Sequence, residues 1–211
     1  MTVGGLNYIL LLFQSKGFPG ACKPVRELRM FAMNDNGINR INRCQPGYGA
    51  SCSLCCGSHN YAMPPERIQD MFMDRERACP DRPLQHAEVA CSEKLFPDEL
   101  QCPNVGMQDS EPGLLCCLVY GEHDRGEEFE SFFNGTCKTF LCPAWYCLTD
   151  RQVLFAARLM GDWYYYGLLI NDVESVQDLC ARYGRPEDVP AEELASLKSD
   201  LVEFFMEEDG K

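Results

Sequence analysis

The pattern of hydrophobic and polar positions changes at about Leu148. From there on, apolar side chains recur every three to four residues, as they do in amphipathic or buried helices. Thr149-Asp150-Arg151-Gln152 has the form of a capping box, which predicts the start of a helix. We expect one long helix from this point, a second from about Val173 that stops before Gly184 and Pro186, and a third from about Pro190 to Met206.

The long helix is predicted to lie at the centre of the fold, because it carries large apolar side chains on most of its faces. The aromatic run at residues 163–166 is interpreted as part of this core rather than as an electron relay. Cys180 is interpreted as a buried apolar cysteine of the second helix. The main stripe of the long helix contains Val153, Ala157, Met160, Tyr164 and Leu168, and the last helix is expected to turn Leu194, Leu197, Leu201, Phe204 and Phe205 inward.

Residues 1–147 show much less periodicity. Pro64-Pro65-Glu66 is expected to open one helix that ends at Cys79-Pro80, and residues 114–120 form one plausible strand. The many Gly, Asn and Pro residues elsewhere predict loops. The predicted fold is therefore mainly α with little sheet. A loop-rich lobe, 1–147, is expected to carry a helical segment, 148–211, either as two units or as one domain.

Charge is spread unevenly along the chain. The chain has 19 Lys and Arg against 32 Asp and Glu, and residues 1–50 hold six of the former and two of the latter, which leaves 13 basic and 30 acidic residues. An acidic body repels phosphate backbones, so no nucleic-acid partner is expected. No stretch reaches the roughly 20 apolar residues of a membrane span. The apolar run at 6–13 lacks the basic start of a signal peptide, which favours a cytoplasmic protein.

Cysteine is the most distinctive component, with 14 in 211 residues. Disulfide-dense scaffolds are mostly much smaller chains, so reduced thiols are favoured. Cys52 and Cys55 are separated by two residues, a spacing that lets one turn present both sulfurs to one ion. Adjacent residues such as Cys55 and Cys56 are expected to point apart, so that one of them serves a second site or the core. His59 is a candidate for a mixed site, although an exposed loop histidine is the more frequent case.

A family resemblance rests on three blocks of the chain. Cys52-x2-Cys55-Cys56, the segment 113–120 with Cys116-Cys117, and Cys137-x4-Cys142 resemble the CxxCxxCC family of bacterial cysteine-cluster proteins, which are described as zinc- or iron-chelating. The resemblance covers about residues 44–147. Gly49 stands where the family has its first cysteine, and Cys44 would replace that ligand only through a longer loop. Spacing and resemblance together predict a metal site drawn from Cys44, Cys52, Cys55, Cys56, Cys102, Cys117, Cys137 and Cys142.

Three classes of function follow from these observations. The favoured one is a metal-binding protein with an iron-sulfur cluster, such as 4Fe-4S, or a thiolate zinc site, in a redox, metal-handling or structural role. The second is a cluster-dependent enzyme that modifies a protein partner, because a relative of the CxxCxxCC family, the flagellin lysine methylase, carries such a cysteine block. No glycine-rich loop for a methyl donor follows a strand here. The third is an exported disulfide-bonded protein, for which an even cysteine count is expected. The sequence indicates no catalytic residues.

Overall fold

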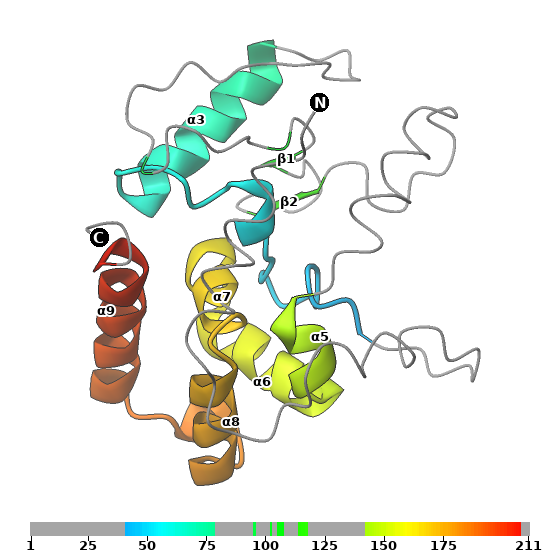
Figure 1. The fold of residues 1–211 in the computed structure, drawn as a ribbon, viewed down its shortest axis with the longest axis vertical. Helices are drawn as coiled ribbons and strands as arrows, with labels where there is room; N and C mark the ends of the chain where they lie inside the picture. The colour runs from blue at the N-terminus through cyan, green and yellow to red at the C-terminus, as the bar shows by residue number, and fades with distance from the viewer. Residues whose placement is uncertain are drawn as a thin grey trace, which may run out of the picture.

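A computed structural model describes residues 41–78, 95, 102, 105–107, 114–117 and 142–207. This part of the chain is mainly helical with one small sheet, as predicted (Figure 1). Its elements are η1 (Leu54–Cys56), α3 (Pro65–Ala78), β1 (Val105–Met107), β2 (Leu115–Cys117), α5 (Pro143–Cys147), α6 (Asp150–Met160), α7 (Trp163–Leu169), α8 (Val173–Arg182), η3 (Pro186–Asp188) and α9 (Ala191–Glu207).

The capping box at the start of α6 is confirmed. The Thr149 hydroxyl accepts a hydrogen bond from the Gln152 amide at 3.3 Å, and the Gln152 side chain accepts one from the Thr149 amide at 2.9 Å. These contacts satisfy two amide groups that the first helical turn leaves without partners. They fix the point at which the helical part of the chain begins.

The prediction of one long helix from residue 149 onward is wrong, because the helix ends at Gly161. Gly161 adopts the left-handed conformation, with φ of 64°, and its amide donates to the carbonyl of Ala157. Asp162 then caps a new helix, α7, by accepting a hydrogen bond from the Tyr165 amide at 2.6 Å. A glycine stop followed at once by an aspartate start interrupts an apolar pattern that otherwise runs through both helices.

The helices after residue 142 pack around α6 and α7. Helix α6 contacts α7 and α8, helix α9 lies along α7, and the short α5 touches α8 (Figure 1). The aromatic run belongs to the core as predicted, with Trp163, Tyr164 and Tyr166 buried. Leu201 of α9 is also buried, but Phe204 is 53% exposed, so the prediction that it faces inward is wrong. Cys180 is partly buried and packs against the core.

Helix α3 and the small sheet lie together at the other end of the molecule (Figure 1). The helix predicted to open at residues 64–66 is confirmed, and its side chains Ile68 and Phe72 are fully buried. Strand β2 confirms part of the strand predicted at 114–120. It pairs antiparallel with β1, with Gly106 opposite Cys116. Strand β1 and helix α5 lie in a region that the sequence predicted as loops.

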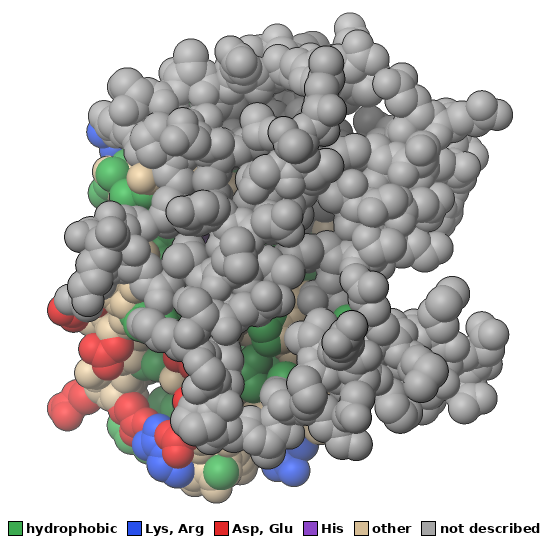
Figure 2. All heavy atoms as spheres, viewed as in Figure 1, with side chains coloured by type: hydrophobic (Ala, Val, Ile, Leu, Met, Phe, Trp, Pro, Cys, Tyr) green, Lys and Arg blue, Asp and Glu red, His purple; other side chains and the backbone are tan. Residues whose placement is uncertain are grey.

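The buried residues of both ends belong to one hydrophobic cluster, which includes Phe72 and Leu115 together with Val153 and Leu169. In the described ranges no helix is long and apolar enough to cross a membrane. Acidic side chains gather on the surface along α9 (Figure 2), where Glu192, Asp200 and Glu203 are exposed.

Candidate metal centre

Backbone hydrogen bonds bring four of the predicted cysteines onto one framework. The Cys52 amide donates to the carbonyl of Cys44 at 2.9 Å, and the Cys102 amide donates to the carbonyl of Cys56 at 3.0 Å. The second bond joins segments that are far apart in the sequence. The cysteine-rich loop is therefore held against Cys102 by its main chain, independently of the side chains.

The spacing of Cys52 and Cys55 is carried by a single turn. In η1 the Cys56 amide donates to the carbonyl of Ser53 at 3.0 Å, and Gly57 ends the turn in the left-handed conformation, with φ of 85°. The hydroxyls of Ser51 and Ser53 both donate to the carbonyl of Leu115, at 2.6 and 3.2 Å. These buried hydrogen bonds tie the loop to strand β2.

Gly49 occupies a position that no cysteine could take without strain. Its φ is 73°, in the left-handed region that side chains with a Cβ rarely adopt. A Cβ atom at Gly49 would also lie 3.1 Å from the carbonyl oxygen of Gly161. The glycine at this position therefore has a local structural reason, and the nearest cysteine before it is Cys44.

Five thiols lie together, and we call them the thiol cluster: Cys52, Cys55, Cys56, Cys102 and Cys142. The Cys56 thiol hydrogen-bonds with the thiols of both Cys55 and Cys102. Cys52, Cys55 and Cys142 lie close enough for their charges to interact. The expectation that Cys55 and Cys56 point apart is not met, because their thiols interact directly.

Cys142 reaches the thiol cluster from a different part of the chain. It immediately precedes α5, whose first helical residue is Pro143. The carbonyl of Cys142 accepts a hydrogen bond from the Trp145 amide at 3.0 Å, which fixes the turn. The cluster thus collects sulfur atoms from the loop before α3, from the segment before β1 and from the start of α5.

Burial and hydrogen bonding between the thiols keep Cys52, Cys56 and Cys142 protonated in the absence of a metal. Desolvation raises the pKa of Cys142 to about 11, and desolvation followed by repulsion from Cys55 and Cys142 raises the pKa of Cys52 beyond the usual range. Hydrogen bonds with Cys102 and Cys55 raise the pKa of Cys56. The hydrogen bond from Cys56 lowers the pKa of Cys55, so Cys55 ionises more readily than Cys52, Cys56 or Cys142.

Side chains from α7 and the α7–α8 connection contact the cluster. The Asn171 amide nitrogen lies 3.7 Å from the sulfur of Cys52 and also donates to the carbonyl of Gly167 at 2.8 Å. The Cys52 thiol points at the same carbonyl, at 4.0 Å. Asn171 therefore fixes the position of Cys52 and provides a donor that favours its thiolate.

Tyr166 is the aromatic residue next to the thiols. Its hydroxyl donates to the carbonyl of Arg43 at 2.8 Å. Burial raises the pKa of the Tyr166 hydroxyl, and the thiols of Cys52, Cys44 and Cys142 raise it further. Cys44 therefore lies near the same tyrosine as the cluster thiols. Tyr166 shields this side of the cluster from water.

Arg43 is a buried cation beside Cys44, and its side chain is only 1% exposed. Its guanidinium donates to the carbonyls of Ile41 and Leu148, at 2.5 and 3.2 Å, and pairs with Asp150 at 2.9 Å. It also lies 4.8 Å from the centre of the Trp145 ring. Arg43 thereby joins the cysteine loop to α5 and α6. No local pattern in the sequence marks Arg43, Tyr166 or Asn171 as residues of this site.

His59 is a buried core residue, neither an exposed loop histidine nor a free ligand. Its Nδ1 accepts from the Ser58 hydroxyl and its Nε2 donates to the carbonyl of Tyr164, each at 2.9 Å. Its ring stacks on Tyr164 at 4.7 Å. Because both ring nitrogens are engaged, the hypothesis that His59 completes a mixed site does not fit this arrangement.

The structure describes the remaining predicted ligands only in part. Cys117 is the last residue of β2, and only its backbone is described; Cys137 lies outside the described residues. In the part of the chain that is described, no three His, Cys, Asp or Glu side chains are arranged to hold an ion as they stand. An ion would therefore require the thiols to turn from one another toward a common point. Cys147 is disulfide-bonded.

Comparison of the chain with protein-family models, with curated proteins and with solved structures found no match.

Proposed function

We propose that this chain is a metal-binding protein of the CxxCxxCC type, whose centre is a thiolate zinc site or an iron-sulfur cluster held by the thiol cluster. The observation that carries the proposal is the meeting of five cysteines from three separate segments beside one buried tyrosine. Thiolate-only donor sets are typical of structural zinc sites and of iron-sulfur clusters.

The thiols of the cluster would be the first ligands, and Cys44 is the nearest further candidate beside Tyr166. Metal binding requires thiolates, so it would release protons from groups whose pKa the protein holds high. Cys55 would lose its proton more easily than Cys52, Cys56 or Cys142, which makes it the natural first ligand among these four. The bound metal would supply a cross-link between the cysteine loop, the segment before β1 and α5. The protein would then have a redox, metal-handling or structural role. It would act in the reducing cytoplasm, with another protein as its partner.

The test is elemental analysis of anaerobically purified protein, with a visible absorption spectrum. We expect stoichiometric zinc, or iron with acid-labile sulfide and a brown colour. Cys52→Ser should lose the metal and destabilise the cysteine loop, whereas Cys180→Ser should keep it, because Cys180 lies on α8 outside the cluster. Equal metal content and equal melting curves in the two variants would contradict the proposal.

A second candidate is an exported, disulfide-bonded protein, and the disulfide at Cys147 favours it. Counting free thiols under denaturing conditions separates the two. The metal-binding proposal predicts at least the seven free cysteines Cys44, Cys52, Cys55, Cys56, Cys102, Cys142 and Cys180. A protein without free thiols and without metal would support the exported form.

A further inference from the structure

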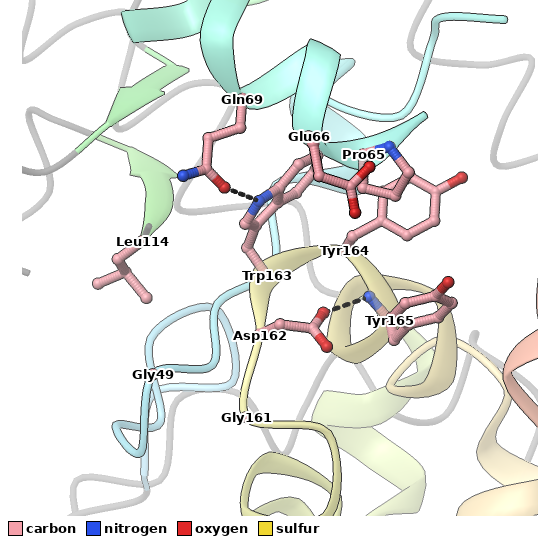
Figure 3. A pocket seen from close by; sticks show the side chains of 10 residues that line it. All are labelled: Gly49, Pro65, Glu66, Gln69, Leu114, Gly161, Asp162, Trp163, Tyr164 and Tyr165. Atoms are coloured by element: carbon pink, nitrogen blue, oxygen red, sulfur yellow. Dashed lines mark hydrogen bonds between the residues drawn. The ribbon is translucent and has the colours of Figure 1, made fainter. Parts of the chain in front are cut away.

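A cavity of about 370 Å³ lies between the first turn of α3 and the start of α7, and none of the described cysteines lines it (Figure 3). This volume is within the range of sites that bind small molecules. The cavity is not part of the candidate metal centre described above. Its walls come mainly from α3 and the start of α7, with Gly49 and Leu114 beside them, and none of the five cluster thiols lines it, so its ligand can be considered separately.

Aromatic rings form one wall of the cavity. Trp163 and Tyr164 meet edge to face at 5.4 Å, and Tyr164 and Tyr165 do so at 5.3 Å. The Trp163 indole donates to the side-chain oxygen of Gln69 at 3.4 Å, which links the wall to α3 (Figure 3). Because each ring is held by its neighbours, the wall is rigid, and ring faces carry the partial negative charge that attracts cations.

Two carboxylates also line the cavity. Glu66 comes from the first turn of α3, and Asp162 caps α7 (Figure 3). Asp162 is engaged, because one oxygen accepts from the Tyr165 amide and the other lies 3.6 Å from the ammonium of Lys198. Glu66 is exposed and has no ion pair with the described residues. Among the described residues no Lys, Arg or His lines the cavity, so its lining charges are these two carboxylates, of which Asp162 is paired with Lys198.

Lys198 shows that a primary ammonium group fits this environment. Its nitrogen lies 4.3 Å from the centre of the Tyr165 ring, in addition to its ion pair with Asp162. Lys198 is not among the lining residues, so it approaches this ring and carboxylate from beside the cavity. Burial raises the pKa of the Tyr165 hydroxyl, and the charges of Asp162 and Glu66 add to the rise. Glu66 therefore offers a second carboxylate near the same ring.

We propose that this cavity binds a small organic cation, an ammonium group with an apolar substituent, with Glu66 as its carboxylate partner and the Trp163–Tyr165 rings as its apolar wall. The ammonium pairs with Glu66 and lies against a ring face. The substituent packs against Trp163 and Tyr164. This site is independent of the metal centre, and its failure would leave the proposed function untouched.

The experiment is a titration of the full-length protein with butylammonium chloride, followed by the indole N–H signals in ¹H–¹⁵N spectra. The two tryptophans are Trp145 and Trp163, and Trp145→Phe assigns them. We expect a saturable shift of the Trp163 signal, while Trp145 serves as the internal reference. Butan-1-ol has the same apolar chain without the charge, and sodium chloride supplies the same ionic strength. Neither should produce that shift.

Matched variants test the partner residues. Glu66→Gln should weaken butylammonium binding by about threefold or more, because it removes one exposed carboxylate. Asp70→Asn, also an exposed acid of α3, should leave it unchanged because Asp70 does not line the cavity. Lys198→Met should tighten butylammonium binding, because Asp162 then loses its ion pair with Lys198 and its charge is left for the ligand. A shift that never saturates, an equal shift with butan-1-ol, or equal affinities in the Glu66 and Asp70 variants would overturn the proposal.

Discussion

The backbone of Gly167 lies directly against the imidazole of His59. A Cβ atom at Gly167 would be 2.7 Å from Cε1 of that ring, closer than real Cβ contacts allow. The carbonyl of the same glycine accepts from Asn171 and faces the Cys52 thiol. Gly167 is thus the point at which the aromatic core and the thiol cluster meet.

Gly167→Ala should therefore destabilise the fold by about 2 to 3 kcal/mol, because neither the α7 backbone nor the hydrogen-bonded His59 ring can move freely. Chemical denaturation measures this free energy of unfolding. Gly184→Ala is the matched control, since nothing lies within 4 Å of a Cβ there, and it should change stability by less than about 0.5 kcal/mol. Equal stability of the two variants would show that the contact at Gly167 is tolerated.

The stability of the fold should fall as the pH is lowered from about 6.5 to about 4. Burial lowers the pKa of His59 to about 4, against an ordinary value of 6.5, so in this window the unfolded chain binds a proton that the folded chain does not. The difference amounts to roughly 3 kcal/mol of pH-dependent stability.

Denaturation curves of the wild type and of His59→Gln across this pH window test that expectation. The variant keeps a polar side chain but has no imidazole, so its stability should depend less steeply on pH. Parallel pH profiles for the two proteins would mean that other groups cause the dependence.

Arg43→Met should destabilise the protein by about 3 to 5 kcal/mol, because it leaves Asp150 and two carbonyl oxygens without their buried cation. Thermal and chemical unfolding measure the loss. Arg185→Ala removes an exposed pair with Asp188 and should cost less than about 1 kcal/mol. A small effect at Arg43 would show that water replaces the guanidinium at no great cost.

Asn171→Ala should lower metal affinity about 10- to 100-fold if the thiol cluster holds the metal, because Cys52 loses the amide that orients it. Competition with a chelator measures the affinity. Gln177→Ala is the control, since Gln177 donates to the carbonyl of Cys147 and not to a thiol of the cluster. Identical chelator competition in both variants would show that Asn171 does not contribute to metal affinity.

Local signals predicted the helices well. The capping box at Thr149 and the proline at the start of α3 act within one turn, so they can be recognised from a few residues. The break between α6 and α7 was missed although Gly161 and Asp162 are also local signals. Apolar residues on both sides of them continued the helical period and concealed the stop.

The thiol cluster was only partly predictable. The spacing of Cys52 and Cys55 is local, and the structure brings their predicted partners Cys102 and Cys142 to them. Asn171 and Tyr166 contact residues more than 100 positions away, and such contacts arise only from the tertiary packing of α7 and of the connection that follows it. No periodicity or spacing in the sequence carries that information.

Metal K-edge X-ray absorption on the anaerobically purified protein identifies the atoms bound to the metal, and so shows whether the cysteines hold it. We expect a coordination shell of sulfur only, at about 2.3 Å if the metal is zinc. Cys52→Ser should reduce or abolish that signal. A coordination shell of nitrogen and oxygen would contradict the claim that these cysteines form a metal centre. The absence of bound metal in anaerobically purified protein would contradict it as well.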